Sequence, residues 1–526
     1  MLAFAALKGA GWLVFSRFVG RFIDFFNVLI LARLLSPAEF GLAALAMALV
    51  VVIDTVLEVP VTQALVRLQV LDKSHLDTGF TLGVLRSLAI TVIFLVATWP
   101  YSLINGNPLL VPVIAAMALG PIAKGFMSPA MVHFARDLKF RPTFAVETIS
   151  KLCAFATAVI TVAAGGGYWA IVVNFVTTAF VATIASYWVA PYRPAFSLKR
   201  LSDFAGFIGW FSSAQLVSAL NWQFDRFLIG SAGNNAMLGR YAVASDIAVI
   251  PTQSIIGPAL QPVMAAFSQI SSSADRMRTA FLKASHFAML VSLPVCVGIS
   301  LTADLVTDIL LGTQWRDAAP YLSLLALSVI PIPYFQTLYS ASLALDRPAV
   351  VFRLNTIDLC FRVLLISIGF YLFAAHGASI ARILVASVMA VFYVAEARQL
   401  FGLGPWKQFQ NIWKVLVSAS VMAIVVTWLR TAMPVSDLPV VIQLAAAASV
   451  GAATYLGTLF GLGMRVAITS GRPEPGRSVI FSNQGPNEPA CRAGACAHTI
   501  GKRSAGAFSG KQADDGEKQC HGDLHP

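Results

Sequence analysis

The chain has 526 residues, of which 57% are apolar and only 12% are charged. That is about half the charge density of soluble globular domains, which excludes a soluble enzyme, a disordered chain and a disulfide-stapled secreted domain. The net charge of +12 is assigned to cytoplasmic loops and to basic residues within membrane spans, not to a nucleic-acid partner. The composition therefore predicts a polytopic membrane protein.

A transmembrane helix needs about 20 apolar residues, and the chain contains about 14 such stretches. The first stretch runs on without the small-residue cleavage site of a secretory signal. The predicted fold is therefore an all-α polytopic membrane protein with about 14 transmembrane helices. The predicted spans are residues 10–34, 39–68, 77–103, 108–132, 143–165, 168–190, 204–230, 236–270, 280–303, 318–344, 350–374, 377–400, 410–432 and 437–463.

The loops between these spans alternate in charge. Basic residues gather in loops such as 136–141 and 193–200, whereas the loops at 105–107, 165–167 and 233–235 carry no charge. Because basic loops stay on the cytoplasmic side, we expect both termini to be cytoplasmic.

The chain also repeats itself. A shift of 198 residues places Gly11-Trp12 on Gly209-Trp210, Gly41 on Gly239, and Pro60-x-x-Gln63 on Pro258-x-x-Gln261. The shift covers six predicted helices, an even number, so the two copies have the same orientation in the membrane, as in several transporter folds. Beyond about residue 466, Pro, Gly, Ser and charged residues replace the apolar runs, which predicts a disordered tail. The predicted units are a six-helix lobe at 1–200, a second at 201–403, two additional helices at 404–465 and a cytoplasmic tail at 466–526.

Two short stretches carry a resemblance to a known family. Residues 32–42, read as ARLLSPAEFGL, resemble the "ARxLxPxxFG" turn of bacterial Wzx-type polysaccharide flippases. These proteins belong to the multidrug/oligosaccharidyl-lipid/polysaccharide exporter superfamily. Residues 238–244, read as LGRYAVA, resemble the family's "LGxYxxA" opening of the eighth helix, and residues 258–268 resemble its "P..FPxxS" stretch. The resemblance covers roughly residues 5–460 and is closest to the exopolysaccharide branch.

The resemblance implies both a fold and a function. The fold would be two six-helix bundles in a V around a central cavity, with two additional helices. The function would be the flipping of an undecaprenyl-diphosphate-linked oligosaccharide across the bacterial inner membrane, for exopolysaccharide or O-antigen biosynthesis, by alternating access. The lipid-linked oligosaccharide and membrane lipids are the implied partners, and a polysaccharide polymerase and export machinery are further candidates. No cofactor is expected other than coupled H⁺ or Na⁺.

Charged residues inside the spans are costly and mark candidate sites. Arg17, Arg21 and Asp24 share one stripe of the first helix. In the family fold this helix and helices 2, 7 and 8 line the cavity, where guanidinium suits a diphosphate and an aromatic ring can stack on a sugar. The candidate substrate-binding residues are Arg17, Arg21, Asn221, Trp222 and Arg362, and the candidate ion-coupling residues are Asp24, Asp54, Glu58, Asp225 and Asp246.

Structural interpretations of the same residues remain open. Arg17 or Arg21 could form an inter-helix ion pair with Asp54 or Glu58. Glu147 and Lys151, one helical turn apart, are expected to pair with each other. Arg382 is expected to be solvated at the outer end of its helix.

Two other functions compete with the flippase. A drug/cation antiporter of the same fold would need a cavity dominated by carboxylates and aromatic rings, and the basic residues argue against it. A polysaccharide polymerase or ligase would need a large outer loop with catalytic residues, whereas the predicted outer loops are short. No Walker P-loop is present, so the chain does not hydrolyse ATP by that route.

Overall fold

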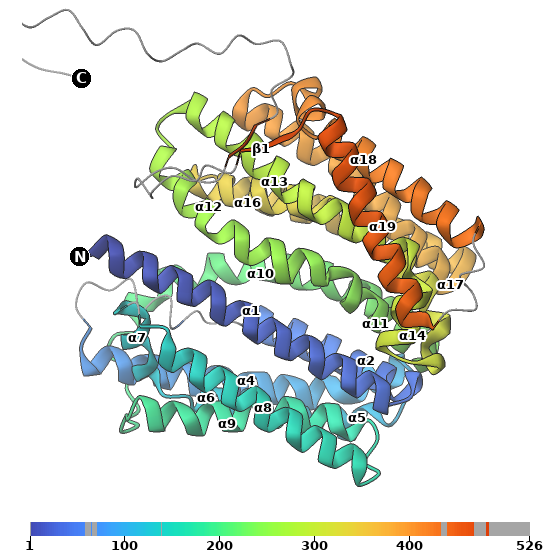
Figure 1. The fold of residues 1–526 in the computed structure, drawn as a ribbon. Coiled ribbons are helices and arrows are strands. Elements are labelled where there is room, and N and C mark those ends of the chain that lie inside the picture. The colour runs from blue at the N-terminus through green and yellow to red at the C-terminus, as the bar shows by residue number, and fades with distance from the viewer. Residues whose placement is uncertain are drawn as a thin grey trace, which may run out of the picture. The chain divides into compact units, whose positions relative to one another are not determined.

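The computed structural model describes residues 2–57, 61, 65, 71–137, 139–432, 439–467 and 480–482. Within this part, the side chains of 2–14, Arg17 and 202–215 are among those outside the described set. Glu58 and the predicted tail, apart from residues 466–467 and 480–482, also lie outside it. The described chain is almost entirely helical (Figure 1). Two short strands, β1 (Arg465–Ala467) and β2 (Ile480–Ser482), pair antiparallel.

The first half of the chain contributes the helices that precede the basic loop at 193–200. They are α1 (Leu2–Leu34), α2 (Pro37–Val56), α4 (Lys73–Ile104), α5 (Leu110–Met117), α6 (Leu119–Gly125), α7 (Val132–Arg136), α8 (Arg141–Ala163) and α9 (Trp169–Val189), with the short 3₁₀ helix η1 (Pro129–Met131).

The second half continues to the additional helices near the C-terminus. It contains α10 (Ser202–Ala232), α11 (Asn235–Ile250), the π-helix η2 (Pro251–Ile256), α12 (Gly257–Ile270), α13 (Ala274–Leu301), α14 (Ala303–Leu310), the 3₁₀ helix η3 (Thr313–Ala318), α15 (Ala319–Ser328), α16 (Ile332–Ala344) and α17 (Pro348–Phe401). The additional helices are α18 (Pro405–Ala432) and α19 (Val440–Gly461).

Nine described helices are long and apolar enough to cross a membrane, and a bent pair at residues 110–136 makes ten. The all-helical, multi-span prediction is therefore confirmed. Two predicted spans, 350–374 and 377–400, occur together as α17, which is broken at Phe373 and Ala374. Ala374 has a φ of 51°, and the backbones of Gly369 and Gly377 approach so closely that a Cβ on Gly377 would lie 1.8 Å from the Gly369 carbonyl oxygen. The chain therefore turns back on itself at this break.

The second helix of each half begins with a side-chain cap. The Ser36 hydroxyl accepts a hydrogen bond from the Glu39 amide at 3.3 Å, and the Glu39 carboxylate accepts one from the Ser36 amide at 2.9 Å. This capping box, with Pro37 in the first turn, starts α2. Asn234, which the 198-residue shift places on Ser36, caps α11 by accepting from the Met237 amide at 2.8 Å.

Both of these helices are also interrupted. α2 ends at Val56, and Pro60, which has no amide hydrogen, follows in the sequence. α11 ends at Pro251, which has no amide hydrogen to donate. The chain continues there as the π-helix η2, in which the hydrogen bonds follow the i→i+5 pattern. Interrupted helices at corresponding positions of two halves often mark a transporter's binding site.

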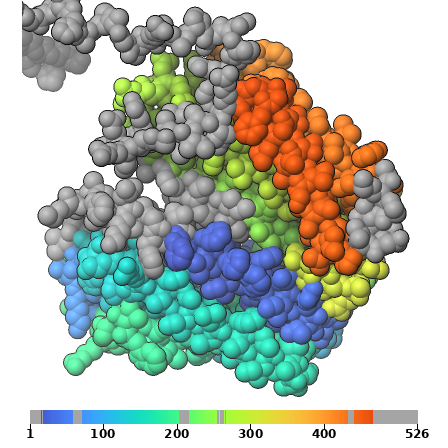
Figure 2. Space-filling model, in the orientation of Figure 1, coloured from blue at the N-terminus to red at the C-terminus, as the bar shows by residue number. Residues whose placement is uncertain are grey.

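The two halves meet mainly through α2, which packs against α10 and α11. A large apolar core joins them there, with Leu45 of α2, Tyr241 of α11 and Trp315 of η3 all buried. α1 lies against α8 of the first half and also contacts η2 and α12 of the second (Figures 1 and 2).

Candidate functional site

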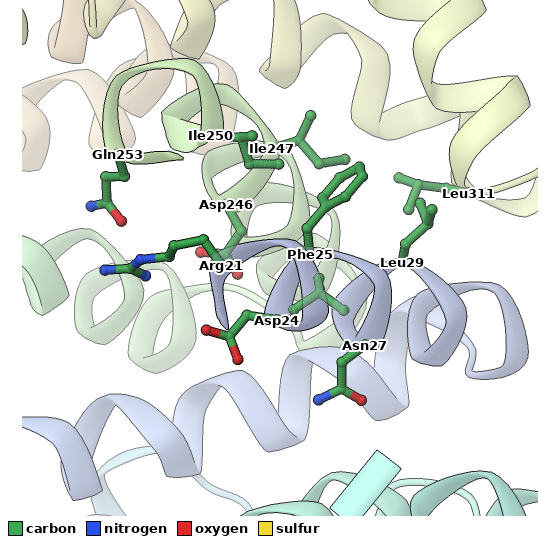
Figure 3. Close-up of a pocket in the computed structure, with 11 residues that line it drawn as sticks. Arg21, Asp24, Phe25, Asn27, Leu29, Asp246, Ile247, Ile250, Gln253 and Leu311 are labelled. Carbon is green, nitrogen blue, oxygen red and sulfur yellow. The ribbon is translucent and has the colours of Figure 1, made fainter. Parts of the chain in front are cut away.

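A cavity of about 390 Å³ lies between α1 of the first half and α11 and η2 of the second. We call it the interlobe cavity. Arg21, Asp24 and Asn27 line it from α1, and Asp246 and Gln253 line it from α11 and η2 (Figure 3). At about 1.5 Å per residue, Arg21 lies about 20 Å along α1 from its end at Leu34, which is well inside a membrane span. The structure therefore brings together three of the candidate residues, Arg21, Asp24 and Asp246.

Both carboxylates of the interlobe cavity have basic partners. The Lys151 ammonium lies 2.7 Å from Asp24 and also donates to the Gly20 carbonyl at 3.1 Å. The Arg226 guanidinium lies 2.5 Å from Asp246. Helical spacing predicts Lys151 as a partner of Glu147, whereas the structure shows it bonded to Asp24, and Arg226 is not among the residues predicted from the sequence. Each pair brings together one negative and one positive charge, so the two pairs add no net charge to the cavity wall.

Arg21 differs from these residues. Its side chain is exposed to the cavity, and among the described residues no hydrogen bond or ion pair engages it. Of the two carboxylates considered as partners for Arg21, Asp54 pairs instead with Arg86 and Lys124, and Glu58 lies outside the described residues. Both carboxylates among the described lining residues are compensated. The guanidinium of Arg21 therefore gives this lining a net positive charge and five hydrogen-bond donors for an anion.

A second, smaller pocket lies within the second half, between α10, α16 and α17. Its volume is about 100 Å³, and Asn221, Trp222 and Arg362 line it together with Asp358. We call it the second-half pocket. The Asn221 amide donates to the Asn355 carbonyl at 2.8 Å, while Asn221 Oδ1 and Arg362 Nε are buried without a hydrogen-bond partner among the described residues. Trp222 is 44% exposed, so its ring remains available to a ligand.

Asp225 lies behind this pocket in a charge cluster. It accepts hydrogen bonds from Arg382 and, at 2.9 Å, from the Tyr241 hydroxyl, and Arg362 lies 3.7 Å away. Arg362 also reaches Asp358 at 3.2 Å. Arg382 is 8% exposed, so the expectation that it is solvated at the end of its helix is wrong. The two carboxylates and two guanidinium groups balance one another in this cluster.

Asp54 lies apart from both cavities. Its carboxylate is 2.6 Å from Arg86 and 3.7 Å from Lys124. Arg86 also donates to the carbonyl oxygens of Asp54 and Leu57 at 2.7 and 2.6 Å. Asp54 lies in the last turn of α2 and Leu57 directly follows its end, where carbonyl oxygens are not bonded within the helix. Arg86 therefore caps the interrupted end of α2, and Asp54 holds it there.

The four described ion-coupling candidates, Asp24, Asp54, Asp225 and Asp246, are thus all ion-paired. A sequence signal exists for one partner. Arg226 and Asp246 flank the turn at 233–235, so antiparallel helices bring them to within about 6 Å of the same depth. No comparable sequence signal links Asp225 to Arg382, because 157 residues separate them in the chain.

These features define a class: a multi-span, all-helical membrane protein with a charged cavity between two halves. Two solved structures share the fold. One is described as "Lipid II flippase MurJ, inward closed conformation", with a TM-score of 0.67 and 14% identity over 84% of this chain and 97% of that one. The other is an inward-facing multidrug resistance MATE family transporter of the MOP superfamily, with a TM-score of 0.60 and 15% identity over 74% and 98%.

The chain belongs to the family described as "Polysaccharide biosynthesis protein", whose model matches residues 30–320. Its relatives include the succinoglycan biosynthesis transport protein ExoT of Rhizobium meliloti (strain 1021), 26% identical over 61% of this chain and 65% of ExoT. The lipopolysaccharide biosynthesis protein WzxC of Escherichia coli (strain K12) is 20% identical over 77% and 84%. The teichuronic acid biosynthesis protein TuaB of Bacillus subtilis (strain 168) is 24% identical over 86% and 94%. The resemblance to Wzx-type flippases is confirmed.

Proposed function

We propose that this protein flips a lipid-linked oligosaccharide, carried on undecaprenyl diphosphate, from the cytoplasmic to the outer leaflet of a bacterial inner membrane. The observation that carries the proposal is the guanidinium of Arg21, which has no ion-pair partner among the described residues, in a cavity whose carboxylates already have partners. The relatives named as biosynthesis transport proteins support the class of substrate. In this proposal the halves 1–200 and 201–403 act as two lobes that alternate access to the cavity.

The chemistry of the cavity suits such a substrate. A diphosphate offers several oxygen acceptors, and a guanidinium can engage two of them at once while remaining charged. In the second-half pocket, Trp222 provides a flat apolar face and Asn221 Oδ1 an unused acceptor, which are groups that bind sugar rings and their hydroxyls. Arg21 would hold the diphosphate, and the second-half pocket would contact the sugar.

A drug/cation antiporter is less well supported. A cationic substrate needs carboxylates that are free to receive it, and the described candidates each hold a basic side chain. For ion coupling we propose Asp24 and Asp246, because they line the interlobe cavity. A coupled ion that binds either carboxylate would compete with Lys151 or Arg226 and so change the charge that faces the substrate.

The test is reconstitution of the purified protein in vesicles with a fluorescent undecaprenyl-diphosphate oligosaccharide, quenched from outside by an impermeant reductant. We expect the wild type to expose the label from the inner leaflet and Arg21→Ala to slow this by about tenfold or more, the loss of one strong charge-assisted contact. The matched control is Arg347→Ala, which removes an exposed arginine that does not line the cavity and should flip normally. Failure of the wild type to flip, or normal flipping by Arg21→Ala, would overturn the proposal.

A further inference from the structure

The end of α1 is held by side chains of the other half of the molecule. The indole Nε1 of Trp315, in η3, donates to the Ala32 carbonyl at 2.7 Å. The Gln314 amide donates to the Arg33 carbonyl at 3.1 Å and lies within 3.4 Å of the carbonyl oxygens of Ala32 and Leu35. Carbonyl oxygens at the end of a helix have no partner within the helix. The second half of the chain therefore caps a helix of the first half.

The capping is reciprocal. Arg33, in the last turn of α1, donates from Nε to the Leu310 carbonyl at 2.8 Å and from its terminal nitrogen to the Ile309 carbonyl. Leu310 is the last residue of α14, so these carbonyls are also without helical partners, and a cation there is favoured by the helix dipole. Each half of the molecule thus completes a helix end of the other.

One aromatic residue anchors this junction. Trp315 is fully buried, and its ring meets that of Phe40 edge-on, with centroids 5.8 Å apart. By contrast, the side chains of Arg33 and Gln314 are exposed. Figure 2 shows the yellow α14 region against the end of blue α1. The polar contacts can therefore be exchanged for water, whereas separation of the halves requires that the Trp315 ring leave its site.

The backbones touch beside this junction. A Cβ on Gly41 would lie 1.7 Å from the Asn235 carbonyl oxygen, and one on Gly239 would lie 1.9 Å from the Pro37 carbonyl oxygen. The 198-residue shift predicts that Gly41 and Gly239 occupy equivalent places in the two halves. Only glycine allows α2 and α11 to approach this closely, so the contact is built into the sequence of both halves.

We propose that residues 309–315 form a latch that closes the two halves at the end of α1 and is released once in every transport cycle. The inference rests on the proposed function, because alternating access requires the cavity to open at this end. With cytoplasmic termini, the end of α1 is periplasmic, and latch release is the step that delivers the oligosaccharide to the outer leaflet.

The first test links the two halves covalently. Arg33→Cys with Gln314→Cys, in a chain whose six native cysteines are replaced by serine, is cross-linked by a short bifunctional methanethiosulfonate, which joins the two thiols through reducible disulfides. We expect flipping to fall about tenfold or more and to recover on reduction. The control pair, Asp308→Cys with Arg316→Cys, replaces a 3.0 Å ion pair within the second half, so its cross-link should leave flipping intact. Normal flipping by the cross-linked 33–314 protein would overturn the latch.

The second test needs no substrate. Ala32 is fully buried beneath Trp315, so Ala32→Cys should react slowly with an impermeant maleimide added from outside. Adding Arg33→Ala and Gln314→Ala, which alter exposed side chains, should raise the labelling rate about tenfold through the loss of several net hydrogen bonds. An unchanged labelling rate would contradict the latch, even if the protein does not flip any lipid. A raised labelling rate in a protein that does not flip lipid would overturn only the proposed function.

Discussion

The interlobe cavity and the cluster behind the second-half pocket both place arginine and aspartate within the membrane span, but they differ in burial and in pairing. Asp225 and Arg382 are buried and bonded to each other and to their neighbours. Arg21 is exposed to a cavity whose two carboxylates hold other partners. An intramembrane charge therefore indicates function only when its partners are known, because a charge that is paired can have a purely structural role.

The largest expected effect is on stability and belongs to the buried cluster. Arg382→Ala should lower the free energy of unfolding by roughly 3–5 kcal/mol, because the buried Asp225 carboxylate loses its directly bonded guanidinium and keeps only the Tyr241 hydroxyl and the more distant Arg362. Thermal unfolding in detergent and the amount of protein in the membrane measure this. Combining it with Asp225→Ala should restore much of the loss. Wild-type stability of Arg382→Ala alone would contradict the structural role of the cluster.

The second prediction concerns Arg21, where we expect a loss of transport with little loss of stability. Arg21→Ala should change the free energy of unfolding by no more than about 0.5 kcal/mol, since no described partner is lost, while polysaccharide export fails. Arg21→Lys should recover part of the export, because an ammonium keeps the charge without the planar fork. Membrane abundance and surface polysaccharide, measured together, separate the two effects. If membrane abundance and surface polysaccharide fell together, Arg21 would have a structural role like that of Arg382 and Asp225.

The smallest expected effect is at Asp24. Asp24→Asn should cost less than about 1 kcal/mol of stability, because the pair with Lys151 is partly exposed. It should also tighten the binding of a lipid diphosphate by a few-fold, because Lys151 gains freedom to join Arg21 at the cavity wall. Affinity measured at low and high salt tests this, since the gain should shrink as salt rises. Weaker binding at low salt would show that Asp24 positions the site.

Much of the fold follows from sequence patterns that are local. The apolar runs predict the long helices, and Ser36, Pro37 and Glu39 give the start of α2. The stripe on the first helix likewise predicts Arg21 and Asp24 on one face, and the structure places both at the cavity. Helical periodicity suffices for these features because each depends on residues within one or two turns.

The charge partners could not be predicted in the same way. Lys151 meets Asp24 across 127 residues, and Arg382 meets Asp225 across 157. Periodicity gives the face of a helix that carries a charge, but the helix that packs on that face is decided by the whole bundle. The latch was missed for the same reason, because Gln314 and Trp315 bond to backbone carbonyls of α1, which carry no sequence signal.

The most direct measurement is the affinity of the purified protein for undecaprenyl diphosphate, compared between the wild type, Arg21→Ala and the exposed control Arg347→Ala. We expect Arg21→Ala to raise the Kd about tenfold or more, at unchanged melting temperature, while Arg347→Ala binds like the wild type. A Kd for Arg21→Ala equal to that of the wild type would contradict the claim that this guanidinium holds the diphosphate.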